Sequence, residues 1–193
     1  MTAGSTYGEA LGRRLYTAEQ ISAAIGRLAG AIAADYAGQP LLLLGVLKGA
    51  LYLTVDLSRA LAAVADGPSE IMVDYICVSR YGTSTESSGA PRLLLGASVP
   101  VEGQNVLLVD DIADNGLTLE SLGAFIQKRR PASLRTCVLF DKPSRRRVEV
   151  PLHYAGLPLP DAFAVGYGLD YQELYRNLPY LAELNLQASF EKK

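Results

Sequence analysis

The sequence predicts an α/β fold in which helices flank a mostly parallel, twisted sheet. Short apolar runs typical of buried strands alternate with longer segments whose apolar residues recur at helical spacing. The connections between them are short, which favours strands that run in the same direction with helices between them. Ligands of such sheets bind beyond the carboxyl ends of the strands. We therefore expect the functional residues to follow the predicted strands.

Helical spacing is found in three segments. The first begins at Thr17, whose separation from Gln20 matches a capping box, and it ends at the break Gly38-Gln39-Pro40. Residues 1–12 show no such spacing and are expected to form a loose arm. The other two helices are predicted over residues 50–64 and 117–129.

Seven further segments have the pattern of strands. Each is a short apolar run or a short alternation of apolar and polar residues. These segments are 41–46, 71–79, 92–95, 105–110, 134–140, 151–155 and 162–165.

The composition is that of a globular protein without bulk positive charge. The 193 residues suit one domain, and 49% of them are hydrophobic. Lysine and arginine total 18 against 20 acidic residues, so the overall charge does not favour a nucleic-acid partner. Cys77 and Cys137 lie in apolar stretches and are interpreted as core residues. We expect a cytoplasmic protein with no membrane partner, because we find neither a signal segment nor an apolar run near the ~20 residues that span a bilayer.

The most informative segment is 106–119, in which a buried strand is followed by acids, a short loop and a helix. Asp110 and Asp111 come at the end of the predicted strand and could accept hydrogen bonds from neighbouring sugar hydroxyls. Gly116 and Thr118 stand at the start of the helix, where unpaired amides and the helix dipole bind phosphate. Together these features are typical of a ribose 5-phosphate site. The alternatives are an acid pair beside a capped turn, or a P-loop enzyme, whose G-x-x-x-x-G-K-[ST] motif is missing from the sequence.

Four other segments have ordinary interpretations when read from their residues alone. Lys48, in a Gly-flanked turn, and Lys142, at a strand end, would be solvated lysines. The small, polar segment 79–89 would be an exposed hairpin connection. Phe163 would be a core residue and Arg176 a surface charge.

Taken in order, however, these motifs resemble those of a known family. Segment 106–119 resembles the phosphoribosyl diphosphate signature of type I phosphoribosyltransferases, and residues 13–183 resemble the hypoxanthine-guanine phosphoribosyltransferase family. The resemblance implies a magnesium-dependent enzyme of purine salvage that joins hypoxanthine or guanine to phosphoribosyl diphosphate, giving IMP or GMP and pyrophosphate. It also implies one domain over 1–193, with a lid loop at about 79–91, a hood from the N-terminal arm and about 151–185, and a dimer or tetramer.

The resemblance assigns most of the motif residues to the phosphates and the sugar. Lys48 and Gly49 would hold pyrophosphate, in a loop with a cis peptide at the Lys-Gly step. Tyr81 matches a lid residue, whereas Arg80 stands where many relatives have serine and could meet pyrophosphate oxygens itself. Asp110 and Asp111 match the residues that bind the ribose hydroxyls, and they are also further metal candidates. Asp170 matches a magnesium ligand, and Arg176 a contact to pyrophosphate. The residues matched to the 5-phosphate are Asn115, Gly116, Leu117 and Thr118.

The base would be bound by a second group of residues. Lys142 would donate to the oxygen at C6 and so select 6-oxopurines over adenine. Phe163 would stack on the ring, and Ala164 and Val165 would lie at its edge. Asp114 matches the acid near N7 of the base and would be the general base.

Two other functions share the predicted fold. A nucleic-acid-binding regulator would need a basic face and would lack Asp114, Lys142 or Asp170, all of which this slightly acidic chain has. An enzyme for adenine or orotate is disfavoured by Lys142 and the segment 165–170. Outside these motifs, Arg145-Arg146-Arg147 is interpreted as a solvated turn, and His153 as a residue without a catalytic role.

Overall fold

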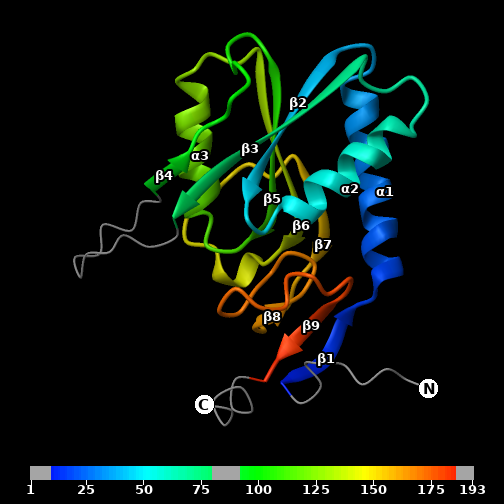
Figure 1. Ribbon diagram of the computed structural model, residues 1–193, viewed down its shortest axis with the longest axis vertical. Helices are drawn as coiled ribbons and strands as arrows, with labels where there is room; N and C mark the ends of the chain where they lie inside the picture. The colour runs from blue at the N-terminus through cyan, green and yellow to red at the C-terminus, as the bar shows by residue number, and fades with distance from the viewer. Residues whose placement is uncertain (1–9, 80–91, 186–193) are drawn as a thin grey trace.

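The centre of the computed structural model, which describes residues 10–79 and 92–185, is a six-stranded sheet (Figure 1). Its strand order is β4-β3-β2-β5-β6-β7, and every neighbouring pair is parallel except β3 and β4. The prediction of a mostly parallel sheet is therefore confirmed. The strands are β2 (Pro40–Leu47), β3 (Glu70–Ser79), β4 (Arg92–Leu95), β5 (Asn105–Ala113), β6 (Ser133–Asp141) and β7 (Tyr154–Pro158).

Three helices cover the two faces of this sheet. Thr17 caps the first helix as predicted: its side chain accepts from the Gln20 amide at 3.3 Å, and the Gln20 side chain accepts from the Thr17 amide at 2.9 Å. None of the helices in the described part of the chain is long and apolar enough to cross a membrane. The helices are α1 (Ala18–Asp35), α2 (Leu51–Ala62) and α3 (Leu117–Gln127).

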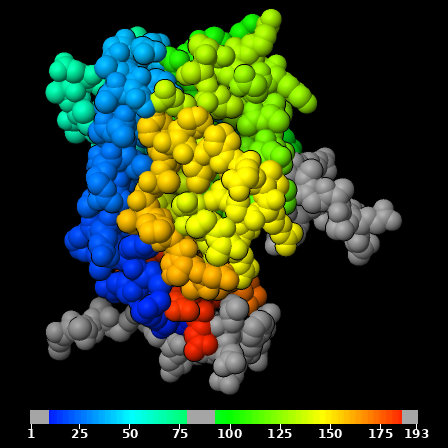
Figure 2. Space-filling view, turned by 180° about the vertical axis from the view of Figure 1, so that it is seen from behind, coloured from blue at the N-terminus to red at the C-terminus, as the bar shows by residue number. Residues whose placement is uncertain are grey.

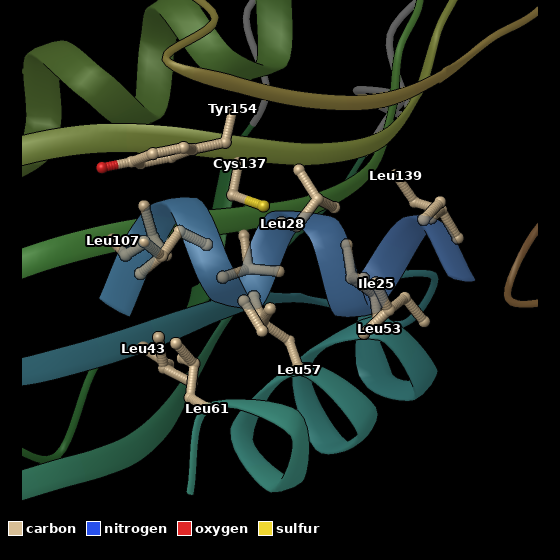
Figure 3. Close-up of a cluster of buried hydrophobic side chains, with 14 of the residues drawn as sticks. Ile25, Leu28, Leu43, Leu53, Leu57, Leu61, Leu107, Cys137, Leu139 and Tyr154 are labelled. Carbon is tan, nitrogen blue, oxygen red and sulfur yellow. The ribbon is translucent and has the colours of Figure 1, made fainter. Parts of the chain in front are cut away.

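The alternation of side chains along β2 explains why its sequence is a continuous apolar run. Leu41 and Leu43 pack in the cluster that contains α1 and α2, whereas Leu42 and Leu44 pack in the cluster that contains α3. Figure 3 shows the first cluster, in which side chains of α1 and α2 meet those of β2, β5 and β6. Cys137 lies in this cluster, where burial raises the pKa of its thiol to about 12, as expected for an unreactive core cysteine.

A second, three-stranded antiparallel sheet lies near the carboxyl ends of the main strands (Figure 1). It consists of β1 (Leu11–Tyr16), β9 (Leu181–Leu184) and β8 (Ala164–Val165), in that order. The prediction of a loose arm over 1–12 is wrong at its end, because β1 begins at Leu11 and pairs with Leu184. Strand β9 was not predicted. This small sheet joins the two ends of the described chain and holds both ends of the 166–180 segment near the carboxyl ends of the main strands (Figure 1).

The last strand of the main sheet is shifted along the sequence relative to the prediction over 151–155. Strand β7 spans Tyr154–Pro158 because its register is set by β6, with Tyr154 opposite Cys137. His153 precedes the strand, and its Nδ1 atom accepts from the Thr136 amide at 3.1 Å. Helix α1 packs along β7, and Figure 2 shows its blue surface beside the yellow-to-orange part of the chain.

Candidate active site

The acid pair lies inside β5 and not beyond its end, which corrects the predicted strand boundary at Asp110. The strand continues to Ala113, and Asp110 and Asp111 are only 5% and 1% exposed. The Asp110 carboxylate accepts from the Asp111 amide at 3.0 Å. Successive strand residues point to opposite faces, so the two carboxylates can approach a ligand at the strand end from different sides.

The loop after β2 lies directly against Asp111. A Cβ atom on Gly49 would come within 1.6 Å of the Asp111 Oδ2 atom, so this close approach requires glycine. A Cβ atom on Gly168 would lie 2.1 Å from the Gly49 carbonyl oxygen. The loop therefore has β5 on one side and the 166–170 turn on the other. Its cis peptide joins Leu47 and Lys48, and the prediction of a cis bond at the Lys48-Gly49 step is wrong.

Three of the predicted site residues meet in one group of ion pairs near this loop. Lys48 Nζ lies 3.0 Å from Glu173 Oε2, and an Arg176 guanidinium nitrogen lies 2.7 Å from Asp170 Oδ1. The same Arg176 nitrogen is 3.4 Å from Glu173 Oε2, and the other terminal nitrogen donates to the Gly168 carbonyl at 2.7 Å. The hydrogen bond from Lys48 holds the pKa of Glu173 below its usual value. Arg176 is 18% exposed, so the prediction of a simple surface charge is wrong.

The loop from β5 to α3 turns tightly at Gly116. Gly116 has a φ of +89°, and a Cβ atom there would lie 2.5 Å from the Val148 carbonyl oxygen. The Asn115 side chain accepts from the Leu117 amide at 3.0 Å, so it satisfies one of the free amides at the start of α3. Asp114 Oδ1 is buried and has no hydrogen-bond partner among residues 10–79 and 92–185. Thr118, in the first turn of α3, is partly buried.

A largely buried arginine of the 143–148 segment contacts this loop. Arg146, which follows the short 3-10 helix η1 (Pro143–Arg145), pairs with the Asp141 carboxylate at 2.5 Å and donates to the Ala113 carbonyl at 3.3 Å. Its side chain is 12% exposed, so the prediction of a solvated turn is wrong for Arg146. Arg145, in contrast, is 60% exposed and pairs with Asp161.

Lys142 begins a second group of residues at the end of β6. It is buried, contrary to the prediction from its sequence position alone, and its Nζ atom donates to the Ala162 carbonyl at 2.7 Å and lies 3.3 Å from the Asp161 carboxylate. The adjacent Phe163 is 44% exposed, so it is not a core residue. Its ring meets that of Tyr171 edge-on at 5.7 Å.

The backbone near Phe163 is held by the small sheet. Val165 is fully buried in β8, and Ala164 beside it is partly buried. Arg80, Tyr81 and the rest of the predicted lid after Ser79 lie outside the described residues; Ser79 itself ends β3.

Known proteins match this chain over most of its length. The family model of the phosphoribosyl transferase domain matches residues 13–172. The hypoxanthine-guanine phosphoribosyltransferase of Crithidia fasciculata is 45% identical over 172 residues, which are 86% of this chain and 81% of the relative. The solved structure of Trypanosoma cruzi hypoxanthine phosphoribosyl transferase has a TM-score of 0.87 at 40% identity and covers 95% of this chain and 96% of its own. This chain belongs to the hypoxanthine-guanine phosphoribosyltransferase family.

Membership of the hypoxanthine-guanine phosphoribosyltransferase family confirms the resemblance drawn from the motifs, and with it the fold. A Staphylococcus aureus hypoxanthine phosphoribosyltransferase also shares the architecture, with a TM-score of 0.86 at 36% identity over 95% of this chain and 96% of its own.

Two residues of the site were missed by sequence reasoning. Glu173 has no motif of its own, and its partner Lys48 is 125 residues away. Arg146 belongs to a run of three arginines, a pattern typical of a solvent-exposed turn. Only its spacing of five residues from Asp141 indicates a local ion pair.

Proposed function

We propose that this chain transfers the phosphoribosyl group of phosphoribosyl diphosphate to hypoxanthine or guanine, forming IMP or GMP and pyrophosphate. The observation that carries the proposal is that the loop after β2, the end of β5 and the 166–176 segment, which are far apart in the sequence, are in direct contact. Gly49 lies against Asp111 and Gly168, and Lys48 shares the Glu173 carboxylate with Arg176. The names of the relatives, which specify hypoxanthine and guanine, support the choice of bases.

In this proposal the sugar and its 5-phosphate lie across the end of β5. Asp110 and Asp111 accept hydrogen bonds from the ribose hydroxyls and fix the ring for attack. The amides of Gly116 and Thr118 bind the 5-phosphate at the start of α3, where the helix dipole favours an anion, while the Leu117 amide donates to the Asn115 side chain. Asn115 has no hydroxyl to offer, and its side-chain oxygen already accepts from Leu117. Its side-chain amide group remains as a donor to the phosphate.

The carboxylates of the site fit magnesium, which prefers oxygen ligands. Asp170 stands beside Arg176, and Asp110 and Asp111 are further candidates. The described residues contain no group of three or more His, Cys, Asp or Glu side chains able to hold a metal by themselves. This suits an ion that takes one or two carboxylates and completes its shell with diphosphate oxygens and water. When bound, magnesium would help to neutralise charge on the diphosphate.

The chemical step is displacement of pyrophosphate from the anomeric carbon by N9 of the base. Lys48 and Arg176 neutralise the charge that develops on the leaving pyrophosphate. Asp114 accepts the proton that the base loses, a role suited to a buried carboxylate oxygen without a hydrogen-bond partner in the described chain. Lys142 donates to the oxygen at C6, and the exposed ring of Phe163 stacks on the purine.

The proposal is tested by incubating the protein with magnesium, phosphoribosyl diphosphate and one purine at a time. Separation of the products should reveal IMP from hypoxanthine or GMP from guanine, with stoichiometric pyrophosphate. No nucleotide from any base would reject the enzyme and favour a regulator with this fold. Nucleotide from adenine alone would reject the proposed choice of base.

Replacement of Lys142 by alanine should weaken base selection more than diphosphate binding. A hydrogen bond from a charged donor contributes about 1.5–3 kcal/mol, so kcat/KM for hypoxanthine should fall about 10- to 100-fold. The KM for phosphoribosyl diphosphate should change much less. Steady-state kinetics with hypoxanthine and adenine measure both effects, and Lys128→Ala, at an exposed lysine after α3, is the control. An unchanged preference for hypoxanthine over adenine would contradict the role of Lys142.

We also propose that the chain forms one domain and assembles as a homodimer or homotetramer in the cytoplasm, with no nucleic-acid partner. The T. cruzi relative has been examined for the role of its C-terminal region on oligomeric state and enzymatic activity, which supports testing assembly here. Light scattering on the protein as it elutes from a size-exclusion column would give the mass of the assembly. The mass of a monomer would contradict this part of the proposal.

A further inference from the structure

One carboxylate oxygen lies between the two cations that we assign to pyrophosphate. Glu173 Oε2 accepts from Lys48 Nζ at 3.0 Å and from an Arg176 guanidinium nitrogen at 3.4 Å. Lys48 and Arg176 come from the loop after β2 and the loop before β9, so the carboxylate joins two distant segments. A single anionic oxygen that bridges a lysine and an arginine is also the arrangement that a phosphoryl oxygen would adopt. Glu173 and the diphosphate therefore compete for the same donors.

The Glu173 side chain is largely exposed, whereas its backbone is held by a hydrogen bond. The Glu173 amide donates to Asp170 Oδ2 at 2.9 Å, and its φ of +66° belongs to a sequence of tight turns. The side chain itself is 62% exposed, as is 64% of the Lys48 side chain. Rotation of the carboxylate into solvent would break the exposed ion pair with Lys48, which is weak, and the 3.4 Å contact with Arg176. Arg176 would keep its ion pair with Asp170 and its hydrogen bond to the Gly168 carbonyl. The backbone would keep the displaced carboxylate close to the bound anion.

We propose that Glu173 is an internal competitor of the diphosphate, occupying the position between Lys48 and Arg176 when no substrate is bound. This inference rests on the proposed function. Substrate binding must displace the carboxylate, which lowers the affinity for phosphoribosyl diphosphate. After the reaction the carboxylate returns to the same two cations and favours departure of pyrophosphate. Glu173 is thus a residue that sets affinity, and it takes no part in the transfer itself.

The test is calorimetric titration of the wild type and the Glu173→Gln variant with magnesium pyrophosphate. Glutamine keeps the size of the side chain and removes its charge. We expect the variant to bind pyrophosphate about three- to fivefold more tightly, the factor that an exposed ion pair provides. The matched control is Glu102→Gln, which removes the same charge from an exposed pair with Arg130 at the other end of β5. The control should bind pyrophosphate as the wild type does.

Steady-state kinetics separate competition from a structural role. Competition predicts a lower KM for phosphoribosyl diphosphate with a kcat that does not rise, because only binding before and after the chemical step changes. A residue that merely supports the loop would instead raise KM on substitution and lower the melting temperature. Equal or weaker pyrophosphate binding by Glu173→Gln than by the wild type would overturn the inference alone. Failure of the wild type itself to bind pyrophosphate would overturn the proposed function as well.

Discussion

Replacement of Asp114 by asparagine is expected to lower kcat by about 100- to 10,000-fold, the range for loss of a general base. The physical reason is that an amide oxygen cannot take a proton from the base at neutral pH. The substitution preserves size, and the buried Oδ1 atom has no hydrogen-bond partner in the described parts of the chain. The fold should therefore survive. The KM for phosphoribosyl diphosphate should change little, because Asp114 is assigned to the base and not to the phosphates. Nucleotide formation at saturating substrates measures the effect.

The control for this prediction is Asp66→Asn, the same chemical change at an exposed turn. Asp66 lies between α2 and β3, at the amino end of the strands, and its φ of +57° is one that asparagine tolerates. This variant should keep the activity and melting temperature of the wild type. If Asp114→Asn kept full activity, Asp114 could not be the base. If it unfolded at a much lower temperature than Asp66→Asn, its loss of activity would reflect the fold.

The parts of the fold that were predicted are those determined by local sequence. Strand β2 is an unbroken apolar run because both of its faces are buried, and that pattern can be read without knowing its neighbours. The start of helix α1 could be predicted because its cap uses the side chains of Thr17 and Gln20, only three residues apart. The loop of Asp114 and Gly116 was also found locally, since a strand, a turn and a helix follow one another there.

The parts that were missed depend on partners far away in the sequence. Strands β1 and β9 are short, and their pairing places Leu11 opposite Leu184, which no local pattern encodes. The register of β7 is set by β6, and the ion pair of Glu173 joins it to Lys48. Strand β5 extends past its apolar run because Ala113 still pairs with Asp141 of β6. In each case tertiary contacts, and not propensity, decide the structure.

Residue type alone gave the wrong environment for two charged side chains. Lys142 and Arg146 were both expected in solvent, as is usual for lysine and arginine at strand ends and turns. Both are largely buried because the chain returns over them, bringing the Ala162 carbonyl to Lys142 and the Asp141 carboxylate to Arg146. Family resemblance identified Lys142, and it gave no indication for Arg146. Burial of a charge with its partners is visible only in three dimensions.

Substitution of Gly168 by alanine should disrupt the contact between the Gly49 loop and the 166–170 turn, which join the two halves of the proposed pyrophosphate site. The new Cβ atom would lie 2.1 Å from the Gly49 carbonyl oxygen, and the φ of +98° is strained for any residue with a side chain. Overpacking and backbone strain together should lower the free energy of unfolding by about 2–4 kcal/mol. The melting temperature should fall by roughly 5–15 °C. Displacement of the Lys48 loop by about 1 Å should reduce kcat/KM about 100-fold.

Gly30→Ala in α1 tests whether this effect belongs to the position of Gly168 or to any added methyl group. Gly30 is exposed, and a Cβ atom there would meet no atom within 4 Å. Alanine should raise the free energy of unfolding by about 0.5–1 kcal/mol, since it favours helix, and should leave activity unchanged. Thermal unfolding and the nucleotide assay compare the two variants directly. Wild-type activity in Gly168→Ala would mean that the Lys48 loop can move without cost, so its contact with the 166–170 turn would not position the pyrophosphate.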